Sequence, residues 1–141
     1  MFQLIVAVIA IALVIALTLA SIFYGGEAFT RSSLKANVAA MVNQAQQISG
    51  AHTLYKTDFA KDAPSLVALE QNEYLAEIPV APKIAAQKAD GTPVDWKYEP
   101  ARGGVYLELG GTVSETCDAV DLNGAGDCYE AGGVTEYGFK L

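Results

Sequence analysis

Residues 2–24 read FQLIVAVIAIALVIALTLASIFY, and this uncharged apolar stretch decides the architecture of the chain. From Leu4 to Ile22 it has no charged residue, and Thr18 and Ser21 are its only Ser or Thr hydroxyls. As a helix, about 22 residues reach roughly 33 Å, which is enough to cross the ~30 Å hydrocarbon layer of a bilayer. The stretch is too long for the apolar region of a cleaved secretory signal. It therefore predicts a membrane-spanning helix.

The flanks of this stretch carry a second signal. No Lys or Arg occurs before Arg31, whereas an N-terminal anchor normally has cationic residues on its cytoplasmic side. We therefore expect the numbering to start after a leader has been removed. The alternative, a helix buried in a globular core, is disfavoured because so small a domain has no room to surround it.

The apolar pattern continues beyond the stretch in a different form. Gly25 and Gly26 interrupt it and mark a place where a helix would soften or unwind, since each costs about 1 kcal/mol relative to Ala. A heptad stripe with alternating gaps of four and three residues then follows. Its members are Leu34, Val38, Met41, Ala45, Ile48, His52 and Tyr55. The opposite side is polar, with Lys35, Asn37, Asn43, Gln44, Gln46 and Gln47. We predict one helix over about residues 2–55.

Such a helix has to protrude from a small head. About 54 residues span roughly 80 Å, whereas the radius of gyration of a compact chain of this length is about 14 Å. The sequence thus predicts an α+β fold in which a long N-terminal helix packs on a small antiparallel sheet. We expect three parts: an apolar helical segment at 1–24, its amphipathic continuation at 25–56, and a sheet-bearing head at 57–141.

The head reads as a short helix followed by strands. Residues 64–71 predict the helix, and the proline-rich residues 74–82 are unsuited to an interior strand. Residues 83–93 read as an irregular loop. Strands are expected at 94–98, 105–109, 112–116 and 134–139, separated by glycine-containing turns and loops. The expected inner face contains Trp96, Tyr98, Leu107 and Leu109.

Two cysteines enclose an acidic, glycine-containing loop. Behind a membrane anchor the head is expected in an oxidising compartment, so Cys117 and Cys128 predict a disulfide. The oxygen-bearing side chains of this region form a weak Ca²⁺ candidate, whose alternative is a solvated acidic turn. They are Asp118, Asp121, Asn123 and Asp127. Ala125 stands where an EF-hand would have a ligand, so we favour the turn.

Charge and composition exclude several functions. The chain has a net charge of −7, and its residues after Ala63 carry 13 acids against 5 bases, which argues against nucleic-acid binding through the head. Two cysteines and one histidine are too few for a cysteine- or histidine-based metal site. His52 reads as a core residue, Trp96 likewise, and Glu27 with Arg31 as a local ion pair. No nucleophile–base or carboxylate pair stands out, so we predict neither an enzyme nor a cofactor.

Taken together, these features resemble a type IV pilin. The likeness rests on residues 2–24, the helical continuation to Tyr55, the segment YLAEIP at 74–79 and the cysteine pair. Gly25-Gly26-Glu27-Ala28-Phe29 is similar to pilins of the type IVb or conjugative kind. The resemblance implies cleavage by a prepilin peptidase, N-terminal methylation, residence in a bacterial inner membrane, and export by pilus assembly machinery to an extracellular filament.

One position departs from that family. Most type IV pilins have a glutamate at the fifth residue of the mature chain, where it pairs with the N-terminal amine of a neighbouring subunit. If Met1 is the mature start, Ile5 holds that place and Gln3 is the only nearby polar side chain. Registry is then expected from Met1, Gln3 and apolar packing. The packing residues are Phe2, Leu4, Ile5, Val8, Ile11, Ile15, Leu19 and Phe23.

The resulting hypothesis is a homo-oligomeric structural protein. The apolar helices would form the core of a helical filament and the acidic heads its surface, because head-to-tail contacts that do not close generate fibres. A pseudopilin of a type II secretion system is a close alternative. A monomeric, membrane-anchored periplasmic binding module is an alternative of a different class.

Overall fold

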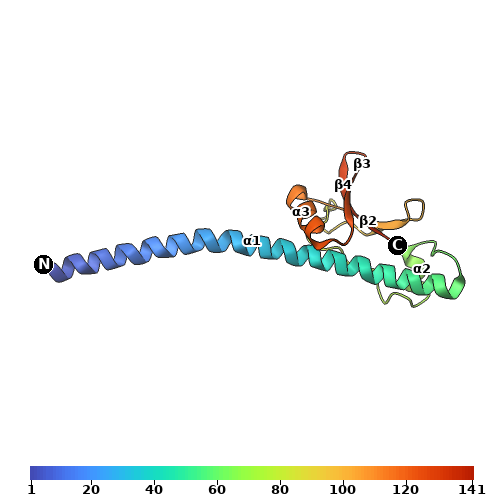
Figure 1. Ribbon diagram of the computed structural model, residues 1–141, viewed down its shortest axis with the longest axis horizontal. Coiled ribbons are helices and arrows are strands. Elements are labelled where there is room, and N and C mark those ends of the chain that lie inside the picture. The colour runs from blue at the N-terminus through green and yellow to red at the C-terminus, as the bar shows by residue number, and fades with distance from the viewer. The chain divides into compact units, whose positions relative to one another are not determined.

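The computed structural model (Figure 1) describes residues 1–23 and 31–141. Helix α1 spans Phe2–Phe59. The chain divides into two units, Met1–Ser33 and Leu34–Leu141. The fold class is the predicted one, α+β, with a long apolar N-terminal helix and a small four-stranded antiparallel sheet. Gly25 and Gly26, where softening is expected, and Glu27 of the expected ion pair lie outside the described residues.

The second unit is built on the predicted heptad stripe. Val38, Met41, Ala45, Ile48, His52 and Tyr55 are all buried, and Leu34 is half-buried. Gln44, expected on the polar side, instead accepts a hydrogen bond from Trp96 Nε1 at 3.0 Å and donates one to the Val80 carbonyl at 2.8 Å. The segment before the sheet is thereby tied to the helix. α1 ends at Phe59, four residues later than expected, and Ala60 follows with a φ of 54°.

The four strands form a sheet of order β1-β2-β4-β3, with every neighbouring pair antiparallel. The strands are β1 (Lys97–Glu99), β2 (Gly104–Glu108), β3 (Asp127–Ala131) and β4 (Val134–Lys140). Two exposed glycines join β3 to β4, Gly132 with φ 62° and Gly133 with φ 85°. Positive φ at both positions is the requirement of the tight hairpin turn that fits the twist of the strands.

One face of this sheet closes the core. Val105, Leu107 and Tyr137 are fully buried, and the register places them on the same face. They belong to one apolar cluster with the buried residues of α1, Trp96, and Leu69 of α2 (Leu66–Gln71). The expected inner-face residues are therefore confirmed for Trp96, Leu107 and Leu109, while Tyr98 is half-buried.

The predicted strand at 112–116 is wrong, because this segment begins helix α3 (Val113–Asn123). Thr116 and Val120 are buried, and together with Val113 they follow helical spacing. Gly124 ends the helix in the left-handed conformation and donates its N–H to the Val120 carbonyl. A further strand, β3 (Asp127–Ala131), was not predicted; it begins at the last residue of the expected cysteine loop and continues beyond Cys128.

The other element boundaries differ by a few residues. α2 begins after Ser65, whose hydroxyl caps it by accepting the Ala68 N–H, so Pro64 precedes the helix rather than lying in its first turn. β1 begins at Lys97 instead of residue 94, and β2 lies one residue earlier than expected. The proline-rich residues 74–82 contain no strand, as predicted.

Candidate functional site

The apolar segment is the feature of the chain that most needs a partner. Phe2–Phe23 has a mean hydropathy of 3.0, and no part of its most apolar window is buried. All the predicted packing residues are exposed, from Ile15 at 54% to Phe2 at 84%. Met1 and Gln3, expected to set registry, are exposed as well. The segment is thus long and apolar enough to cross a membrane.

Its two hydroxyl groups do not need water. Thr18 Oγ1 donates to the Val14 carbonyl at 2.7 Å, and Ser21 Oγ donates to the Leu17 carbonyl at 2.9 Å. Each bond is made within the helix, four residues back. An unpaired hydroxyl would be costly in an apolar medium, so these bonds make the segment compatible with lipid or with a bundle of similar helices.

The predicted disulfide is present in the second unit. Cys117 of α3 and Cys128 of β3 are bonded, with their Cα atoms 5.9 Å apart. The left-handed Gly124 and Gly126 lie in the enclosed loop, which is held by a hydrogen bond from the Tyr137 hydroxyl to the Ala125 carbonyl at 2.9 Å. The bridge therefore joins a helix to an edge strand.

The calcium candidates do not form a site together. Asp118, Asp121 and Asn123 belong to α3, and Asp127 begins β3, where it accepts a hydrogen bond from the Tyr129 hydroxyl. Within residues 1–23 and 31–141, no three His, Cys, Asp or Glu side chains gather as a metal site would require.

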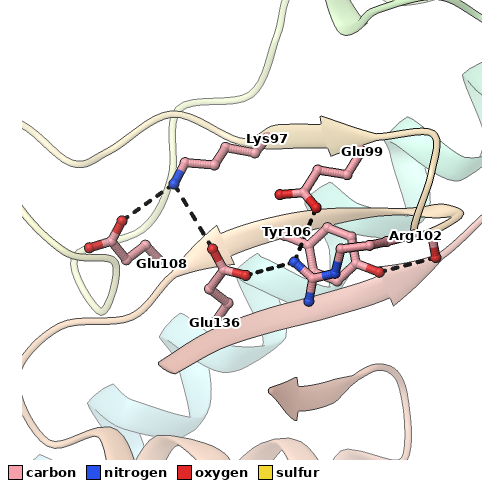
Figure 2. Close-up of polar contacts among 6 residues, drawn as sticks. All are labelled: Lys97, Glu99, Arg102, Tyr106, Glu108 and Glu136. Carbon is pink, nitrogen blue, oxygen red and sulfur yellow. Dashed lines mark hydrogen bonds and ion pairs between the residues drawn. The ribbon is translucent and has the colours of Figure 1, made fainter. Parts of the chain in front are cut away.

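A polar and aromatic cluster covers the outer face of the sheet (Figure 2). Arg102 Nη1 bonds to Glu136 at 3.0 Å and to Glu99 at 3.2 Å. Its guanidinium lies 3.6 Å from the centroid of the Tyr106 ring. The bonds to Glu136 and, less strongly, to Glu99 raise the pKa of Arg102.

Lys97 completes this cluster from the neighbouring strand. Its Nζ lies 3.5 Å from Glu108 and 3.9 Å from Glu136, as the dashed lines in Figure 2 show. Since every charge in the cluster has an opposite partner, its evident effect is to stabilise the turn and strands. Sequence reasoning missed it, because only the strand register places Glu136 beside Arg102 and Lys97.

His52 is a buried polar residue of α1 that contacts Tyr98 of β1. His52 is 5% exposed, and its Nε2 lies 3.3 Å from the Tyr98 hydroxyl and 3.7 Å from Asp62 Oδ1. Burial lowers the pKa of His52, although Asp62 opposes this effect. A hydrogen bond from Lys56 lowers the pKa of Asp62. His52 is thus the core residue that its place on the stripe predicts.

Comparison with known proteins adds no relative: no family model matches the chain, and neither a curated protein nor a solved structure does.

Proposed function

We propose that this chain is a structural subunit of a type IV pilus-like filament. The observation that carries the proposal is the apolar segment Phe2–Phe23, which is uncharged, satisfies its hydroxyl groups internally and has no buried residue in its most apolar window. A surface of this kind has to be covered by lipid or by other copies. In the proposal it is covered by lipid before assembly and by neighbouring subunits afterwards.

The organisation of the second unit supports a filament subunit. The heptad stripe of α1 is buried beneath the sheet, whose edge strand β3 is joined to α3 by the disulfide. The head therefore has a core of its own. Its 13 acidic residues against 5 basic ones after Ala63 suit a solvated outer surface. In this proposal the subunits wait in the inner membrane, are processed by a prepilin peptidase, and are polymerised by pilus assembly machinery.

Electron microscopy of material sheared from the surface of expressing cells tests the proposal. We expect thin filaments whose mass spectrum contains this chain, and whose solved structure buries residues 2–23 between copies. Short filaments confined to the periplasm would favour the pseudopilin. A chain recovered entirely from membranes as a monomer would contradict the filament and favour the anchored binding module.

A further inference from the structure

The second half of α1 carries a second stripe on the side away from the head. Its members again follow gaps of four and three residues, which is the spacing of a helix–helix contact. They are Ala36, Ala40, Asn43, Gln47, Gly50 and Leu54. All of them are exposed except Ala40, which is half-buried. This helix segment runs from cyan to green in Figure 1.

The surroundings of the second stripe lack charge. Residues 36–55 contain no Asp, Glu, Lys or Arg, whereas residues 56–141 carry 22 charged side chains, about one in four. A helix face that remains in water normally has charged side chains on it. Eight of the twenty residues are exposed, and none of the eight carries a charge, which indicates a face that is covered in the working state of the protein.

Gly50 is an independent observation that points to a close neighbour. A glycine within a helix costs about 1 kcal/mol relative to alanine, and no contact among the described residues requires a glycine at this position. A Cβ atom built on Gly50 would meet no atom within 4 Å, and its φ is not positive. The absence of a side chain is useful at this point only if another backbone approaches it.

The side chains on the second stripe identify that neighbour. The exposed side-chain amides of Asn43 and Gln47 bond to no other residue in the part of the chain that the structure describes, and each amide can both donate and accept a hydrogen bond. Against an apolar helix these amides would be left unpaired, at a cost. Against the same stripe of another copy they pair with each other, while Ala36, Ala40 and Gly50 allow close approach.

We propose that the second stripe of α1 binds the second stripe of α1 in another copy of this chain. The contact adds to that of the apolar segment and rests on the proposed function, because a contact of under three heptads needs helices already held side by side. It would give neighbouring subunits a polar register that apolar packing alone does not provide.

Cysteine cross-linking of the full chain in cells tests the contact. Gln47→Cys reports an in-register contact, and Ala40→Cys combined with Gln47→Cys also reports an offset of one heptad. These two positions are too far apart along one helix to bond within a chain. Thr53→Cys lies on the same helix but off the second stripe, and serves as the matched control. We expect covalent dimers or ladders from the stripe variants at about tenfold the level of the control.

A charge on the second stripe should block assembly. Gly50→Glu buries an unpaired charge in the proposed contact, so we expect about a tenfold drop in sheared filaments, whereas Thr53→Glu should retain them. Retention of the native disulfide and of the near-ultraviolet circular dichroism would show that the head of each variant is folded.

The outcomes separate this inference from the proposed function. Wild-type filaments without stripe cross-links above the control, together with normal assembly of Gly50→Glu, would overturn the inference and leave the filament intact. Stripe cross-links in membranes of cells that make no filament would support the inference and contradict the filament. Neither filaments nor cross-links would overturn both.

Discussion

Gly138 of β4 lies where two tyrosine rings cross the outer face of the sheet. A Cβ atom at this position would lie 2.6 Å from Tyr106 Cε1 and 2.6 Å from Tyr129 Cε2. The two rings meet edge to face with centroids 6.0 Å apart, and Arg102 stacks on the first of them. The missing side chain is therefore what allows the cluster of Figure 2 to close over β4.

Replacement of this glycine should destabilise the head. We expect Gly138→Ala to lower the free energy of unfolding by about 1–3 kcal/mol, as overpacking of a filled site does. Urea unfolding of the full chain in detergent measures it. Gly50→Ala is the matched control, because its Cβ meets nothing, and it should stabilise the dispersed subunit by about 1 kcal/mol. Equal effects of both substitutions would contradict this account.

Arg102 should matter more than an ordinary surface cation. Its guanidinium forms ion pairs with Glu136, whose side chain is 9% exposed, and with Glu99. It also stacks on the Tyr106 ring. Lys88, by contrast, pairs with the exposed Asp95. We therefore expect Arg102→Ala to lower the urea midpoint clearly and Lys88→Ala to leave it nearly unchanged, with Arg102→Lys in between because the flat guanidinium is lost. A midpoint unaltered by Arg102→Ala would refute the role.

His52 should make the stability of the head depend on pH. Burial lowers the pKa of its folded form below the ordinary value of 6.5, so the unfolded chain takes up a proton first as the pH falls. The free energy of unfolding is therefore unaffected by His52 protonation above about pH 6.5. It falls as the pH is lowered from there to the pKa of the folded form. Asp62, Lys56 and Tyr98 face the imidazole. The hydrogen bond from Lys56 lowers the pKa of Asp62 and burial raises the pKa of Tyr98, so both shifts lead away from that interval.

Urea midpoints at pH 7.5 and pH 5.5 measure this effect. Wild type should lose more stability between the two values than His52→Gln, which cannot titrate. Parallel losses in the two proteins would show that other groups are responsible.

At the scale of elements, the bond between α3 and β3 is the clearest stabilising feature. On the chain-entropy model, closing a loop of about a dozen residues is worth roughly 3 kcal/mol. We expect Cys117→Ser to lower the free energy of unfolding by about that amount, with increased hydrogen exchange in both elements. Chemical reduction of wild type should give the same loss, and an unchanged midpoint in both experiments would show that packing alone holds the two elements.

The elements with long, regular patterns were predictable from sequence, and the short ones less so. Six heptad positions from Val38 to Tyr55 are buried as expected, because one period persists over three turns or more. Residues 112–116 were wrongly predicted as a strand because they follow the turn signal Gly110-Gly111 and include the β-branched Thr112, Val113 and Thr116. Only the longer spacing through Val120 shows the helix. β3 was missed because it has only five residues, mostly polar or small, which show no clear alternation of apolar and polar residues.

The candidate site divides in the same way. The apolar segment and the disulfide follow from composition and cysteine count, which are properties of the sequence itself. The pairing of Arg102 with Glu136 joins residues 34 positions apart and depends on a strand register that no local pattern specifies. The hydrogen bonds of Gln44 to Val80 and Trp96 are non-local for the same reason.

At the scale of the whole molecule, the proposed membrane insertion and filament assembly both require residues 2–23 to be uncharged. We expect Ile11→Lys, near the middle of the segment, to disfavour membrane insertion by about 2.5–3.5 kcal/mol. The variant should shift from the membrane to the soluble or degraded fraction, while Ile11→Leu behaves as wild type. Immunoblots of fractionated cells measure the distribution. Full membrane retention of Ile11→Lys would argue that some other part of the chain holds it there.

The hairpin between β3 and β4 has a practical consequence. Gly132 and Gly133 are exposed, and a Cβ atom built on either would meet no other atom within 4 Å. Exposed loop tips of this kind accept insertions best. A short epitope spliced between the two glycines would leave the core unaltered. If the subunits polymerise with their heads outward, each fibre would then display the foreign peptide once per copy, as a dense repetitive array suited to immunolabelling or vaccine design.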